Sequence, residues 1–158
     1  MSLPSLPSLR PDDAGADALE LVGRQAQVLL TVGPADTAVA LGSGDVAVLG
    51  TPRLIALCEE ATCAAVRGAV PDDHTTVGVE VAVRHLLPSW PGDVVRADAR
   101  VVAADARRIE FAVVVRSADR EPEDSPEGPQ AGHRVAKPHV LAEGTVIRAI
   151  VARGRFTR

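Results

Sequence analysis

Aromatic side chains are almost missing from this chain of 158 residues, which has no Tyr, one Trp and two Phe. Its 46% hydrophobic content must therefore build a core mainly from Val, Ala and Leu, and abundant Val favours strands. Few rings are present to stack on bases, and the net charge of −4 comes from interspersed acids and bases without a basic stripe. We expect a folded domain with no nucleic-acid partner.

Cysteine is also scarce, with Cys58 and Cys63 as the only two. Both fall in a predicted helix, where positions five apart point about 140° away from each other. This spacing does not suit a disulfide, and two thiols with four scattered histidines do not form a metal site. We interpret both cysteines as small core residues and predict no metal.

No apolar run approaches the roughly 18 residues that span a bilayer. The opening "MSLPSLPSLRPDD" lacks a basic segment followed by an apolar one, as a secretory signal would have. We predict a cytoplasmic protein without a membrane partner, in which a flexible leader at 1–16 precedes a single domain at 17–158.

The order of predicted elements is one strand, one long helix and four further strands. The helix begins at Thr51-Pro52 and ends near Arg67, before Gly68. Strands are predicted at 25–32, 76–87, 92–105, 107–117 and 139–156, with a loop or lid at 37–50 and a mobile loop at 118–138. This order predicts an α+β hot-dog fold, an antiparallel β-sheet wrapped around a long central α-helix. Because such a sheet has free edges, we expect a homodimer.

Two adjacent acids interrupt the helix and fall on different faces when residues are placed at 100° steps. Glu60 lies between Arg53 and Arg67, in a charged stripe typical of surface ion pairs. Glu59 lies on the apolar side near Cys63, where a carboxylate needs a partner or a function. The alternative for Glu59 is a half-exposed position at the edge of the helix.

His85 ends a strand whose alternating residues Val77, Val79, Val81 and Val83 share its face. If this face packs on the helix, His85 points inward, either as a hydrogen-bonded core residue or toward Glu59. Thr51 either caps the helix or offers its hydroxyl for chemistry. A hydroxyl, a carboxylate and an imidazole are together the components of acyl transfer.

These residues resemble the fluoroacetyl-CoA thioesterase-like group of hot-dog proteins. The matching positions are Thr51, Glu59 in "LIALCEEA" and His85 in "VGVEVAVRH", and the final "LAEGTVIRAIV" is similar to a "GT…R" strand of that family. Gly78, seven residues before His85, matches a glycine whose amide is implied to hold the thioester carbonyl. The resemblance covers about residues 20–117 and 139–153.

The resemblance implies an acyl-CoA thioesterase that releases a free acid and CoA from a small acyl-CoA. Thr51, Glu59 and His85 would be catalytic, Gly78 would bind substrate, and CoA would enter only as part of the substrate. One departure is the lid at 37–50, which has none of the aromatic residues that the fluoroacetyl-specific members are expected to use. Two alternatives are a non-catalytic hot-dog module that binds an acyl-CoA or other small acyl ligand, and a hydratase or dehydratase.

Overall fold

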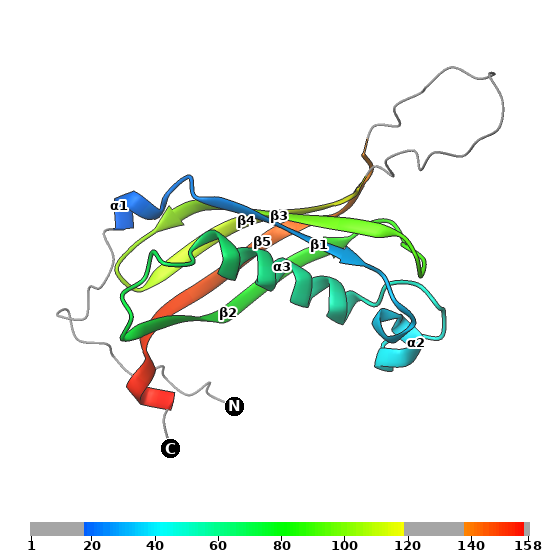
Figure 1. Ribbon diagram of the computed structural model, residues 1–158, viewed down its shortest axis with the longest axis horizontal. Coiled ribbons are helices and arrows are strands. Elements are labelled where there is room, and N and C mark those ends of the chain that lie inside the picture. The colour runs from blue at the N-terminus through cyan, green and yellow to red at the C-terminus, as the bar shows by residue number, and fades with distance from the viewer. Residues whose placement is uncertain (1–17, 119–137, 157–158) are drawn as a thin grey trace, which may run out of the picture.

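The computed structural model describes residues 18–118 and 138–156 (Figure 1). The predicted leader and nearly all of the predicted loop at 118–138 lie outside the described residues. The helices are α1 (Ala18–Leu21), α2 (Ala38–Leu41) and α3 (Thr51–Ala65), with short 3-10 helices η1 (Pro34–Asp36) and η2 (Arg153–Phe156). The strands are β1 (Gln25–Thr31), β2 (His74–His85), β3 (Val94–Ala104), β4 (Arg108–Ser117) and β5 (Val140–Ala152).

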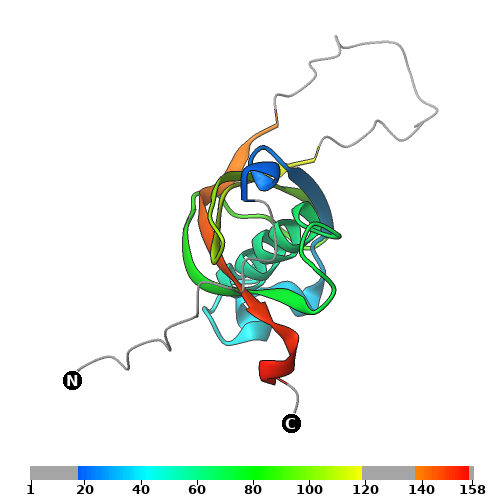
Figure 2. The same ribbon diagram turned by 90° about the vertical axis from the view of Figure 1, so that its left-hand side faces the viewer.

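The five described strands form one antiparallel sheet in the order β1-β3-β4-β5-β2. Seen along α3, the sheet curves around this helix, which runs through its concave side (Figure 2). The predicted α+β arrangement of a sheet wrapped around one long helix is therefore confirmed. β1 and β2 form the two edges of the sheet.

The core lies between α3 and the concave face and is aliphatic, as the composition requires. Alternate residues of β3 and β4 point into it, as their period-2 pattern predicts: Val95, Ala97, Ala99 and Val101 from β3, and Ile109, Phe111, Val113 and Val115 from β4. Leu54, Leu57, Cys58 and Ala61 of α3 meet them and are fully buried. Burying each large aliphatic or aromatic side chain contributes about 1.5–3 kcal/mol. This layer holds α3 rigidly against the sheet.

The strand β2 carries a β-bulge between Gly78 and Glu80, in which Val79 is the extra residue. The prediction that Val77 and Val79 share a face with His85 was wrong, since Val77 lies before the bulge on the opposite face and the Val79 side chain is 48% exposed. A bulge shifts the alternation of side chains by one position. Gly78 therefore lies on the same face as Val81, Val83 and His85, toward α3.

The ends of α3 differ in detail from the prediction. The helix begins at Thr51, but Gly50 is its N-cap and no side chain caps it. The alternative that Thr51 caps the helix is therefore wrong. At the other end, the helix ends at Ala65, and the guanidinium of Arg24 donates to the carbonyl oxygens of Ala65 (3.1 Å) and Arg67 (3.4 Å). A cation at this end also suits the helix dipole.

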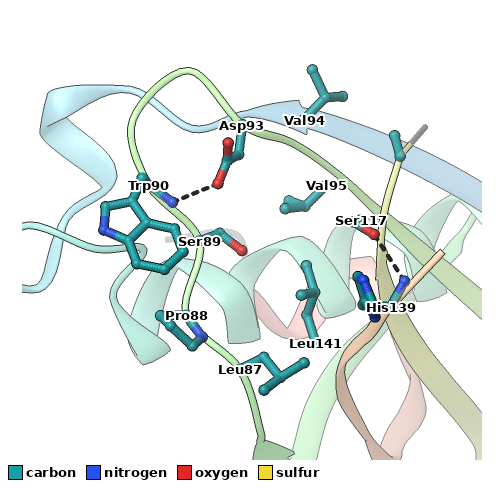
Figure 3. Close-up of a pocket in the computed structure, with 11 residues that line it drawn as sticks. Leu87, Pro88, Ser89, Trp90, Asp93, Val94, Val95, Ser117, His139 and Leu141 are labelled. Carbon is teal, nitrogen blue, oxygen red and sulfur yellow. Dashed lines mark hydrogen bonds between the residues drawn. The ribbon is translucent and has the colours of Figure 1, made fainter. Parts of the chain in front are cut away.

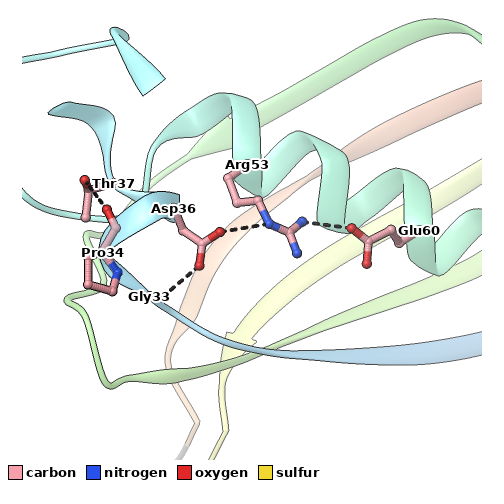
Figure 4. A network of polar contacts seen from close by, with 6 residues as sticks. All are labelled: Gly33, Pro34, Asp36, Thr37, Arg53 and Glu60. Carbon is pink, nitrogen blue, oxygen red and sulfur yellow. Dashed lines mark hydrogen bonds and ion pairs between the residues drawn. The ribbon is translucent and has the colours of Figure 1, made fainter. Parts of the chain in front are cut away.

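The predicted lid at 37–50 contains α2, and Thr37 caps that helix with its hydroxyl. A chain of ion pairs ties the residues before this segment to α3 (Figure 4). Arg53 reaches Asp36 at 3.2 Å and Glu60 at 2.9 Å, and Asp36 also accepts from the Gly33 amide. The predicted surface ion pair of Glu60 is confirmed. Through its second ion pair, with Asp36, Arg53 also holds η1 against the first turn of α3.

The two cysteines are free thiols in different surroundings. Cys58 is fully buried, and burial raises the pKa of its thiol to about 11, so it is unreactive at neutral pH. Cys63 is exposed, so the prediction of a core position was wrong for this residue. Within the described parts of the chain, none of the helices is long and apolar enough to cross a membrane.

Candidate active site

Thr51 and His85 meet at the start of α3. Thr51 Oγ1 lies 3.0 Å from His85 Nδ1, although 34 residues separate the two in the sequence. Thr51 holds this place because it is the first residue of α3, and His85 because it ends β2 on the inward face. In the tautomer that carries its proton on Nε2, Nδ1 accepts the hydroxyl proton of Thr51. The structure therefore brings two of the predicted residues into hydrogen-bond contact.

The imidazole of His85 is half-buried, and its Nε2 atom is buried without a hydrogen-bond partner among the described residues. Burial disfavours the charged ring and lowers the pKa of His85 below its ordinary value. The ring is therefore mainly neutral at pH 7, as a general base must be. Since Nε2 faces inward, Nδ1 is the nitrogen available for proton transfer at Thr51.

Glu59 lies two turns further along α3 and has different neighbours. Its Oε1 atom is 3.6 Å from Nη1 of Arg148 on β5, and its side chain is 38% exposed. The predicted partner thus exists, and the half-exposed alternative is also correct. The same carboxylate lies over Gly78, since a Cβ atom built there would collide with Glu59 Oε1. The glycine at 78 leaves open the space that the Glu59 carboxylate occupies.

The chain therefore forms two polar pairs, one of Thr51 with His85 and one of Glu59 with Arg148 beside Gly78. Among the described residues, no hydrogen bond or ion pair joins Glu59 to Thr51 or His85. Eight residues of helix span about 12 Å, which is too far for direct contact. The expectation that His85 meets Glu59 is not met within one chain.

Glu59 opens onto a cavity of about 530 Å³ along the exposed side of α3. The cavity is lined by Val28, Ala56, Glu59, Glu60, Cys63, Ala64, Arg67 and Arg148. It combines small apolar residues with two carboxylates and two guanidinium groups, and so suits a ligand with apolar and charged parts. In the described ranges, His, Cys, Asp and Glu side chains do not gather in a group of three or more that could hold a metal ion.

A second cavity, of about 430 Å³, lies beyond His85 at the loop between β2 and β3 (Figure 3). Leu87, Trp90, Val95 and Leu141 give it a largely apolar lining, with Asp93 binding the Trp90 amide at 2.8 Å. None of the predicted site residues lines it. The lining also includes Ser117 and His139, but the hydrogen bond between these two residues is donated by the backbone amide of His139 and not by its ring.

A family model described as "FlK: Fluoroacetyl-CoA-specific thioesterase" matches residues 32–121, more than half of the chain. The chain belongs to this family. The match spans Thr51, Glu59, Gly78 and His85, and it confirms the predicted resemblance and the predicted class, a thioester hydrolase acting on acyl-CoA. The comparison with curated proteins found no match.

Solved structures of the same fold support the hot-dog assignment. The fluoroacetyl-CoA thioesterase FlK is 20% identical, with a TM-score of 0.67 over 85% of this chain and 90% of that chain. A thioesterase superfamily member from Thermus thermophilus is 18% identical, with a TM-score of 0.68 over 85% and 86%. A hot-dog-like protein from Thermanaerovibrio acidaminovorans is 19% identical, with a TM-score of 0.67 over 87% and 89%. At sequence identities of 18–20%, these solved structures establish the fold of this chain.

The arginine of the "GT…R" strand, Arg148, lies beside Glu59, and the sequence did not indicate this contact. Arg148 is only 6% exposed and reaches the helix from β5, 89 residues further along the chain. A signal was present, because Arg148 interrupts the apolar strand "TVIRAIV" on a face that is otherwise buried. An arginine buried in a strand requires a counter-ion, and the helical acid on the apolar face was the available one.

Proposed function

We propose that this member of the family hydrolyses a small acyl-CoA to the free acid and CoA at a site made of Thr51, Glu59, Gly78 and His85. The contact between Thr51 and His85 carries this proposal. It places a hydroxyl and a neutral imidazole 3.0 Å apart at the N-terminus of a 15-residue helix. Backbone N–H groups at such a terminus favour developing negative charge, as on a thioester oxygen under attack.

We further propose that a homodimer completes the site through β2. As an edge strand, β2 leaves one side of its backbone free to pair with a second copy. An antiparallel pair with its two-fold axis at Ala82 sets Val81 of one subunit opposite Val83 of the partner subunit. The extra residue of the bulge then brings Gly78 opposite His85 of the partner subunit. The Glu59 carboxylate over Gly78 would then lie beside Thr51 of the partner subunit. Two such sites would form in each dimer.

In this arrangement the groups divide the reaction between them. His85 removes a proton from the Thr51 hydroxyl or from a water held beside it, and the Gly78 amide polarises the thioester carbonyl. Glu59 from the other subunit binds and activates the water that releases the acid. The proton then leaves on the CoA thiol, so that water and thioester give acid and CoA. Both routes, through an acyl-threonine or by direct attack of water, use the same four residues.

The acyl group is proposed to be small, with no preference for fluoroacetyl. One structure of a threonine-to-serine mutant of FlK, a relative of this chain, holds acetyl-CoA. In this chain the segment 37–50 has no aromatic residue to select a fluorinated group. Coenzyme A is needed only as part of the substrate, and a cytoplasmic location, where CoA thioesters are made and used, remains our prediction.

Release of thiol from a panel of acyl-CoAs, from acetyl to hexanoyl and including fluoroacetyl, tests the proposal. We expect turnover that is highest for the short acyl groups and similar for acetyl and fluoroacetyl. Binding of acyl-CoA by calorimetry without any turnover would identify a non-catalytic acyl-binding module instead. A fluoroacetyl rate far above the acetyl rate would contradict the argument from the lid.

The dependence of activity on pH gives a prediction that rests on His85. The imidazole acts as a base only when neutral, so kcat/KM falls as the pH decreases through its pKa. Burial lowers that pKa, so we expect the midpoint of the fall to lie below a pH of about 6.5, the ordinary pKa of histidine. A rate profile from pH 4.5 to 8.5 measures this. An acidic limb centred above pH of about 7 would contradict the assignment of His85 as the base.

A further inference from the structure

Arg148 is the most deeply buried charged residue that the proposed chemistry does not use. It is 6% exposed and lies on β5, with its guanidinium between the sheet and α3. Its Nε donates to Thr76 Oγ1 at 3.0 Å and its Nη2 to the Thr76 carbonyl at 3.1 Å. These bonds fix the plane of the guanidinium against β2, next to the bulge that contains Gly78.

The remaining nitrogen of Arg148 faces the helix. Nη1 lies 3.4 Å from Thr62 Oγ1 and 3.6 Å from Glu59 Oε1. Thr62 also donates its hydroxyl proton to the backbone carbonyl oxygen of Glu59 at 2.7 Å. Arg148 is therefore linked to Glu59 twice, directly at the carboxylate and through Thr62 at the backbone. Within the described part of the chain, Glu59 is the one carboxylate that forms an ion pair with Arg148.

A buried guanidinium is costly unless a carboxylate neutralises it, which favours the position of Glu59 nearest to Arg148. In that position the carboxylate fills the space beside the Gly78 backbone, where no side chain competes. The Arg148 guanidinium on β5 and the absence of a side chain at Gly78 on β2 thus both favour the same position of the Glu59 carboxylate. Fixing a catalytic carboxylate in this way can be worth about 100-fold in rate.

We propose that Arg148 is a positioning residue of the thioesterase reaction, which holds the Glu59 carboxylate over Gly78. This inference rests on the proposed role of Glu59. Arg148 acts on the reaction through Glu59, and so its loss lowers kcat more than it changes KM. Since Arg148 lines the cavity of about 530 Å³ beside Glu59, a small cation can reach its place from solvent.

The test compares R148A, R148M and R148K, with R116A as the matched control. Arg116 is also an arginine of the sheet in an ion pair, with Asp98 at 2.6 Å, but it lies on the face of β4 opposite to the buried residues Ile109, Phe111, Val113 and Val115. For R148A we expect kcat to fall about 100-fold with a small change in KM, and added guanidinium, but not urea, to restore part of it. For R116A we expect activity within twofold of the wild type.

The lysine and methionine variants decide the question even if R148A does not fold. Lysine keeps the charge and methionine keeps much of the volume, so we expect kcat to decrease from wild type to R148K to R148M. Equal kcat for R148K and R148M, or wild-type kcat in both, would overturn the proposal. If the wild type itself shows no turnover, the proposed function fails. Crystal structures of the two variants then decide the positioning role, since Glu59 should remain over Gly78 only in R148K.

Discussion

Replacing His85 by alanine is expected to lower kcat/KM for short acyl-CoAs by about 1,000-fold, with the fold intact. A positioned general base contributes about 10²- to 10⁴-fold, and His85 Nδ1 at 3.0 Å from Thr51 Oγ1 is the one base in contact with that hydroxyl. The half-buried ring contributes little to the core, so the melting temperature should change by only a few degrees. Thiol release and circular dichroism on the same preparation measure both effects.

His139→Ala is the matched control for this variant. His139 is exposed, and its backbone amide, not its ring, makes the hydrogen bond to Ser117 Oγ at 2.9 Å. This variant should therefore keep wild-type activity. If His85→Ala retained more than about a tenth of wild-type kcat/KM, His85 would not be the base that the known magnitude of such catalysis requires.

A single methyl group at position 78 is expected to lower kcat about 100-fold. In Gly78→Ala the new Cβ would collide with Glu59 Oε1, which is the far end of a flexible side chain. The carboxylate can move away, so the protein still folds, but it leaves the place where it activates water. A displacement of about 1 Å in a catalytic group can cost about 100-fold in rate. Kinetics and a melting curve of Gly78→Ala test this prediction.

Gly144→Ala provides the contrast, because the same methyl group would there meet backbone. Its Cβ would collide with the Ala82 carbonyl oxygen and lie 2.7 Å from Val83 Cα, and neither can rotate away. We expect Gly144→Ala to lower the melting temperature strongly, and Gly78→Ala to lower activity without this loss of stability. Wild-type kcat in Gly78→Ala would show that the position of Glu59 does not matter to the reaction.

The fold could be predicted from the sequence because its signals are local. The buried faces of β3 and β4 follow the period-2 alternation of their sequences, and Thr51-Pro52 marked the start of α3 correctly. β2 was the exception, because an unbroken run of alternating valines gave no sign of the bulge at Val79. That bulge decides which face Gly78 occupies.

The site could be predicted only in part, because its geometry depends on contacts between distant segments. Helical periodicity separated Glu59 from Glu60 correctly, and the inward face of β2 indicated His85. The same reasoning could not show that Thr51 takes His85 as its partner while Glu59 takes Arg148. Helical periodicity predicts the direction in which a side chain points but not how deeply it is buried. This also explains why Cys63 was wrongly placed in the core.

Mixing two inactive variants tests most directly whether a dimer completes the site. In a dimer of one Glu59→Gln chain and one His85→Ala chain, one site would combine intact Thr51 and His85 with intact Glu59 from the other chain. Random exchange of subunits should then restore about a quarter of wild-type activity, since half of the dimers are mixed and each has one complete site. Activity that stays at the level of the separate variants, although mass spectrometry shows mixed dimers, would contradict a site shared between two subunits.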